Sequence, residues 1–127
     1  MKRILLVFDD EREMEFMEAN LIENGFEIFK SNSLKEVLEL AIKTSPDLIV
    51  LNTLNMESAV ELFNKDFKKE QLKNTSILSL IELKDYLYVS SEEYFIVKPI
   101  RPKLLLSLIR GLMNHEEVSW LPRMTHI

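Results

Sequence analysis

The sequence contains no cysteine, and it has only 2 glycines and 4 prolines among its 127 residues. The absence of cysteine excludes a disulfide framework and thiolate metal sites, and it fits a reducing compartment. With so few glycines the chain has no glycine-rich phosphate-binding loop, and the scarcity of both residue types argues against long linkers. Because 46% of the residues are hydrophobic, the chain can build one core, and its length is that of a single domain.

Positive charge is also scarce. The 16 Lys and Arg residues are outnumbered by 21 Asp and Glu, which gives a net charge of -5 and no basic stripe, so we expect no nucleic-acid partner. The apolar run 4–8 is too short for a secretory signal, and no later run reaches membrane-spanning length. We therefore expect a cytoplasmic protein with no membrane partner.

Short apolar runs alternate with helical patterns along the chain. Runs of strand length cover 4–8, 47–51 and 77–81, a fifth strand is predicted over 94–97, and a weaker one over 26–30. Apolar residues at helical spacing follow the first, second, third and fifth of these strands, whereas the helix after the fourth is poorly marked. Such alternation predicts an α/β fold, a doubly wound five-stranded parallel sheet with helices on both faces.

Polar residues follow several of the predicted strands where each one ends. Asp9 and Asp10 follow the first strand, Asn52 ends the third, and Lys98 and Pro99 follow the fifth. In open α/β sheets, ligands bind beyond the carboxyl ends of the strands. Two adjacent carboxylates at that edge are suited to a hard divalent cation such as Mg²⁺.

The motifs FDDE at 8–11, DLIVLN at 47–52 and VKPI at 97–100, in this strand–helix order, resemble the receiver domain of bacterial two-component response regulators. The resemblance covers about residues 2–114. It implies a CheY-like, flavodoxin-like fold with strand order 2-1-3-4-5. It also implies Mg²⁺ held by the acidic residues and a phosphorelay step onto an aspartate that ends the third strand.

Carried over residue by residue, the resemblance is partial. It makes Asp9 and Asp10 the acid pair, Lys98 the phosphate-sensing lysine, Pro99 a proline that is often cis, and Phe95 the aromatic switch residue. Two positions depart from the family: Asn52 replaces the phosphoacceptor aspartate, and Ile81 replaces the switch Thr or Ser. The loop after Asn52 is also longer than usual, and the short spacing between the fourth and fifth strands predicts a shortened fourth helix.

The chemistry of Asn52 and Ile81 predicts that the phosphorylation switch is lost. An amide nitrogen is delocalised into its carbonyl and does not attack phosphorus, while receiver phosphorylation needs a carboxylate nucleophile. Ile81 has no hydroxyl to donate to a phosphoryl oxygen. With one negative charge gone, Asp9 and Asp10 retain at most weak Mg²⁺ binding; alternatively, they are acids that favour a helix N-terminus.

The two remaining polar positions have alternative roles as well. Lys98 is interpreted as a structural ion-pair partner of Asp9 or Asp10, or as a solvated strand end. Asn52 is expected to hydrogen-bond Lys98 or the acid pair and so to hold the site in one state.

The last predicted helix is apolar around more of its circumference than one sheet face can bury. Either it is buried unusually deeply, under the tail 115–127 that follows the receiver-like domain 1–114, or it forms an association surface. The second interpretation predicts a protein partner, or a homodimer through the last strand and helix. Its candidate residues are Leu104, Leu106, Met113 and Trp120.

We therefore predict a degenerate receiver, or pseudo-receiver, that acts as a phosphorylation-independent protein-interaction module without catalysis. An alternative is a receiver that still responds to a kinase, through Asp9 or Asp10 as acceptor or by docking. A flavodoxin-like cofactor enzyme is a third hypothesis, which the carboxylates of 8–11 oppose because a flavin phosphate favours backbone amides and hydroxyls there.

Overall fold

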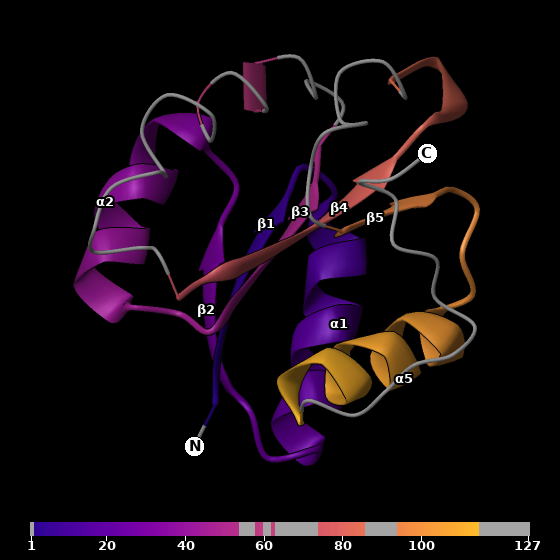
Figure 1. The fold of residues 1–127 in the computed structure, drawn as a ribbon, viewed down its shortest axis with the longest axis horizontal. Helices are drawn as coiled ribbons and strands as arrows, with labels where there is room; N and C mark the ends of the chain where they lie inside the picture. Colours follow the sequence, from indigo (N-terminus) through magenta and orange to yellow (C-terminus); the bar gives the residue numbers. More distant parts are fainter. Residues whose placement is uncertain (1, 54–57, 60–61, 63–73, 86–93, 115–127) are drawn as a thin grey trace.

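The computed structural model describes residues 2–53, 58–59, 62, 74–85 and 94–114 (Figure 1). Its strands form one five-stranded sheet in the order β2-β1-β3-β4-β5, and every neighbouring pair is parallel. The α/β fold and the strand order predicted from the sequence are confirmed. The strands are β1 (Arg3–Phe8), β2 (Glu27–Ser31), β3 (Leu48–Asn52), β4 (Ser76–Ile81) and β5 (Tyr94–Val97).

Helices cover both faces of this sheet. Helices α1 (Glu11–Glu23) and α5 (Pro102–Met113) pack together on one face, and α2 (Leu34–Thr44) lies on the other (Figure 1). The core is correspondingly divided into two apolar clusters, one on each face. A short 3-10 helix, η2 (Leu83–Asp85), follows β4. The helix predicted after the third strand and the shortened helix predicted between the fourth and fifth strands lie largely outside the described residues, and the tail 115–127 lies wholly outside them.

Helix α1 has a capping acid at its start and a glycine just after its end. Asp10 caps its first turn, because Oδ1 of Asp10 accepts a hydrogen bond of 3.0 Å from the backbone N–H of Glu13. Gly25 follows the last turn with a positive φ of 88°, a conformation that glycine adopts without steric cost. The start of α1 therefore lies at the carboxyl end of β1.

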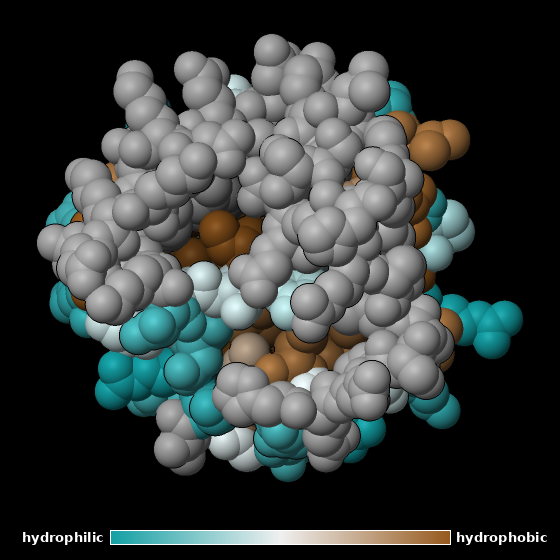
Figure 2. All heavy atoms as spheres, in the orientation of Figure 1, coloured by the Kyte–Doolittle hydropathy of each residue, from teal (hydrophilic) through white to brown (hydrophobic). Residues whose placement is uncertain are grey.

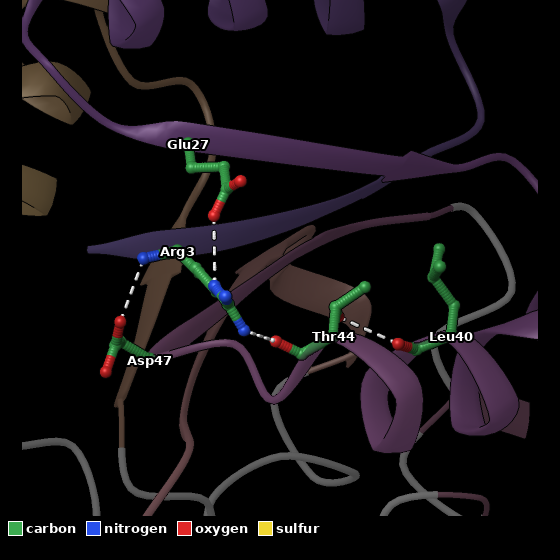
Figure 3. Close-up of polar contacts among 5 residues, drawn as sticks. All are labelled: Arg3, Glu27, Leu40, Thr44 and Asp47. Carbon is green, nitrogen blue, oxygen red and sulfur yellow. Dashed lines mark hydrogen bonds and ion pairs between the residues drawn. The ribbon is translucent and has the colours of Figure 1, made fainter. Parts of the chain in front are cut away.

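Arg3 joins several elements at the opposite, amino-terminal edge of the sheet (Figure 3). Its guanidinium donates 2.9 Å to Glu27 Oε1 on β2 and 2.8 Å to the carbonyl oxygen of Thr44, at the end of α2. Its backbone N–H donates 2.8 Å to the carboxylate of Asp47, which precedes β3. Arg3 thus joins the start of β1 to three neighbouring segments, to two through its side chain and to one through its backbone.

The surface combines polar and apolar residues. In the view of Figure 2, brown apolar residues lie in recesses with teal hydrophilic residues near them. Of the helices in the described part of the chain, none has both the length and the apolar character needed to cross a bilayer.

Candidate functional site at the carboxyl edge of the sheet

The fold brings the polar residues that follow β1 and β3 to one edge. Phe8 pairs with Asn52 in the sheet register, and the backbone N–H of Asp9 donates 3.1 Å to the carbonyl oxygen of Asn52. Beyond β4, the backbone N–H of Lys98 donates 2.7 Å to the carbonyl oxygen of Ile81. The structure therefore places the positions singled out from the sequence at the carboxyl ends of adjacent strands.

Asn52 is buried, with 7% of its surface exposed, and its side chain has a defined partner. Its Nδ2 donates a hydrogen bond of 2.9 Å to Oε2 of Glu13 on α1. The expectation that Asn52 would bond Lys98 or the acid pair is thus wrong for its side chain, and the acid pair is bonded only through the backbone of Asp9. Because α1 starts beside the end of β1, its first turn carries Glu13 over the end of β3.

Glu13 was not singled out in the sequence. A signal for it does exist, since a carboxylate in the first turn of a helix that follows the acid pair must lie near the sheet edge. A hydrogen bond to an ionised acceptor is stronger than one between neutral groups. Glu13 therefore satisfies the buried amide of Asn52 with a negative charge.

The acid pair is engaged by donors from the protein itself. Asp10 caps α1, which agrees with the interpretation of these acids as helix N-terminal residues. Oδ2 of Asp9 accepts 2.8 Å from the hydroxyl of Thr53, a buried residue that sequence reasoning also missed. The two carboxylates thus have structural roles in this arrangement.

The fit of this edge to Mg²⁺, which the receiver fold implies, is poor. The amide nitrogen of Asn52 is directed at Glu13, and an amide N–H is a donor that cannot ligate a cation. Over the ranges that the structure describes, no three Asp, Glu, His or Cys side chains are grouped so that they could hold a metal ion. With its nitrogen donating to Glu13, Asn52 could offer a cation only its carbonyl oxygen, a neutral ligand in place of the carboxylate that the receiver resemblance expects.

Ile81 and Phe95 belong to the same apolar cluster. Their exposed fractions are 0% and 1%, and they pack on the face of the sheet that α2 covers. A buried hydrocarbon side chain therefore occupies the position at which the receiver resemblance expects a hydroxyl. Apolar packing holds this pair.

Lys98 is half-buried, and the peptide bond to Pro99 is cis, as the resemblance implied. The ion pairs found among the described residues are Arg3–Glu27 and Lys30–Glu18. The ion pair of Lys98 with Asp9 or Asp10 that the sequence suggested is not one of them.

The candidate association surface on α5 is smaller than predicted. Leu104 is 48% exposed, and Leu106 is partly buried against the core. Met113 is 4% exposed and lies in the core cluster, so its inclusion among the interface candidates is wrong in this structure. Leu108, Ile109 and Met113 share the face of α5 that packs inward. Trp120 lies outside the described residues.

The comparisons with known proteins agree with the fold. No family model matches the sequence. The chain is 22% identical over 124 residues to the alkaline phosphatase synthesis transcriptional regulatory protein PhoP of Bacillus subtilis, covering 93% of this chain and 51% of PhoP. The chain thus spans about half the length of this curated relative.

Solved structures of response regulators are similar over nearly their whole length. A response regulator from Desulfuromonas acetoxidans has a TM-score of 0.72 and 25% identity, over 91% of this chain and 98% of that one. TrrA of Thermotoga maritima, in complex with Mg²⁺ and BeF, has a TM-score of 0.70 and 26% identity, covering 88% and 99%. Chemotaxis protein CheY4 of Vibrio cholerae has a TM-score of 0.73 and 24% identity, covering 88% and 98%. With the strand order β2-β1-β3-β4-β5, these similarities show that the chain has the CheY-like fold of response-regulator receiver domains.

Proposed function

We propose that this receiver domain works in two-component-type signalling as a phosphorylation-independent protein-interaction module, and not as an enzyme. The observation that carries the proposal is the hydrogen bond of 2.9 Å between the Asn52 amide and the Glu13 carboxylate. Asn52 offers no nucleophile. Its partner Glu13 fills the space next to the amide and places a negative charge there.

Electrostatics supports this proposal beyond the loss of the nucleophile. A phosphodonor carries negative charge on the group that it transfers, and Glu13 places a carboxylate within hydrogen-bond distance of the acceptor position. Like charges at such a separation repel by several kcal/mol at an intermediate dielectric, on the order of 4 kcal/mol at about 4 Å. An aspartate restored at position 52 would therefore still face an unfavourable neighbour.

The response side of the switch is changed as well. Ile81 cannot donate a hydrogen bond, and Phe95 packs against the same apolar cluster with almost no exposed surface. If this aromatic ring moved from its buried position to an exposed one, the protein would lose the free energy of burying it, about 1.5–3 kcal/mol. With no phosphoryl group to offset that cost, we propose that the domain without a bound ligand has a single resting state.

The domain's signal then leaves through a protein contact. A complex of the histidine kinase ThkA with the response regulator TrrA shows that a related receiver binds a kinase. We propose that this chain also binds a protein partner, a kinase or a second copy of itself. For the second copy we propose a surface around Leu104 and Leu106 on α5.

Intact mass spectrometry after incubation with Mg²⁺ and a small-molecule phosphodonor tests the proposal. We expect no phosphoryl adduct on the unaltered protein and little on Asn52→Asp. We expect more on Asn52→Asp/Glu13→Gln, because this variant restores the nucleophile and removes the adjacent charge. Asn52→Asp/Glu15→Gln is the matched control, since Glu15 is an exposed acid on the same helix. A stoichiometric adduct on the unaltered protein would overturn the proposal.

A further inference from the structure

A cavity of about 480 Å³ opens next to the Asn52–Glu13 pair. Its inner wall is apolar and is built from four elements that the fold brings together. The wall residues are Phe8 of β1, Met17 of α1, Leu80 of β4 and Leu105 of α5. All four are buried in the core cluster of this face, so the wall is a fixed part of the core.

Four polar residues also line the cavity, and we refer to them as the mouth of the cavity: Arg12, Glu13, Asn52 and Lys98. Two of the four are cations. Glu13 accepts the hydrogen bond of Asn52, whereas neither Arg12 nor Lys98 takes part in the ion pairs found among the described residues, Arg3–Glu27 and Lys30–Glu18. The chain as a whole has a net charge of -5, whereas the charged residues of this mouth are two cations and one anion. The mouth is therefore locally positive.

Phe16 provides a further reason to assign a ligand to this cavity. It lines the cavity from α1, and 47% of its surface is exposed. Ligand sites are typically apolar hollows with a few polar groups directed into them. A large aromatic ring exposed beside such a hollow also indicates a binding surface. A bound apolar group would cover this ring and remove its surface from water.

We propose that the cavity binds a small amphipathic anion, with its apolar body against the buried wall and its carboxylate or phosphate between Arg12 and Lys98. The volume lies within the roughly 300–1,000 Å³ that small-molecule sites occupy. An arginine presents paired N–H donors that match a carboxylate or a phosphate, and a lysine adds a compact positive charge.

The position of this cavity gives the ligand a regulatory role. The cavity is lined by Asn52, by α1 and by the segment that joins β5 to α5, so that an occupant would contact both the degenerate acceptor and the lysine at the phosphate-sensing position. Binding there would stabilise one arrangement of these elements without any transfer of a phosphoryl group. Ligand occupancy would thus supply the signal that phosphorylation supplies in other receivers.

The test is a titration of the full chain with naphthoate, decanoate and naphthyl phosphate, using naphthalenemethanol and decanol as neutral analogues. Affinity is measured by calorimetry, and the site is located by amide shifts in ¹H–¹⁵N spectra. We expect at least one anion to bind with shifts centred on α1 and residues 98–102, and its neutral analogue to bind about tenfold or more weakly. A preference for naphthyl phosphate over both carboxylates would identify the head group as phosphate.

Variants of the mouth make the test specific. Arg12→Gln and Lys98→Gln should each weaken the anion about tenfold, whereas Lys103→Gln, an exposed cation outside the cavity, should leave its affinity unchanged. The proposal is overturned if none of the three anions binds, if neutral analogues bind equally well, or if the shifts lie elsewhere. This titration uses no phosphodonor. A failure to bind the anions would therefore leave the proposed phosphorylation independence untouched.

Discussion

Nδ2 of Asn52, at the end of β3, lies 2.9 Å from Oε2 of Glu13 in the first turn of α1. The amide donates and the carboxylate accepts, so that the two side chains are complementary only in this combination. An aspartate at position 52 would place two carboxylates in contact, and an alanine at position 13 would leave a buried amide without this acceptor. The residues at positions 13 and 52 are therefore energetically coupled.

A double-mutant cycle measures that coupling. We expect Glu13→Ala and Asn52→Ala to interact by about 1 kcal/mol in the free energy of unfolding, because the bond is charge-assisted but only partly buried. Urea denaturation of the two single variants and the double variant gives the value. Glu15→Ala, combined with Asn52→Ala, should be additive, and equal coupling in both cycles would show that the Glu13 bond is not the cause.

Substitution of Ile81 by threonine tests the switch position. The side chain is fully buried in an apolar cluster, so the new hydroxyl would lose its hydration there, and we expect a loss of about 2 kcal/mol or more in unfolding free energy. Ile81→Val shortens the side chain without adding a polar atom and should cost about 1 kcal/mol. If threonine is tolerated as well as valine, the position has a hydrogen-bond acceptor for a hydroxyl and is not purely a packing site.

Arg3→Ala should destabilise the amino-terminal edge of the sheet. The variant loses the hydrogen bonds to Glu27 and to the Thr44 carbonyl, and we expect a cost of about 1 kcal/mol, since the ion pair itself is largely exposed. Chemical denaturation measures the difference. Lys2→Ala removes a neighbouring exposed cation and serves as the control. Equal stability of the two variants would mean that Arg3 contributes nothing beyond its charge.

Substitutions on α5 test whether this helix mediates self-association. If a second copy binds there, Leu104→Glu should shift the protein to monomer, because this side chain is the one exposed large apolar residue on the described part of that helix. Light scattering across a concentration series measures the mass. Lys103→Glu, an adjacent exposed position, tests whether charge alone has this effect. A mass that does not respond to Leu104→Glu would place any self-association elsewhere.

Most of the fold was predictable because its signals are local. Continuous apolar runs such as 4–8 mark strands buried on both faces, and the acid before α1 and the glycine after it mark helix ends. The positions of Asp9, Asp10, Asn52 and Lys98 at one edge then follow from parallel strands. These features depend on residue order and not on side-chain packing.

Side-chain partners were less predictable, since they depend on how elements approach one another. The sequence indicates Lys98, Asp9 and Asp10 as candidate partners of Asn52. The packing of α1 on the sheet brings Glu13 to the Asn52 amide instead. In the same way, apolar residues surround most of α5, and the rotation of the helix decides that Met113 is buried while Leu104 is exposed. Periodicity identifies the faces of a helix but not the contacts of each residue.

Phosphorylation independence is tested most simply by titrating the unaltered protein with Mg²⁺ and beryllofluoride, a mimic of the phosphoryl group. The response is monitored in ¹H–¹⁵N spectra that resolve the Asn52 side-chain amide. We predict that the signals of this amide and the backbone signals of Phe95 and Lys98 stay unchanged at every concentration of the mimic, because the hydrogen bond to Glu13 persists. Asn52→Asp/Glu13→Gln should show more change than Asn52→Asp. Saturable shifts of Asn52, Phe95 and Lys98 in the unaltered protein would contradict phosphorylation independence.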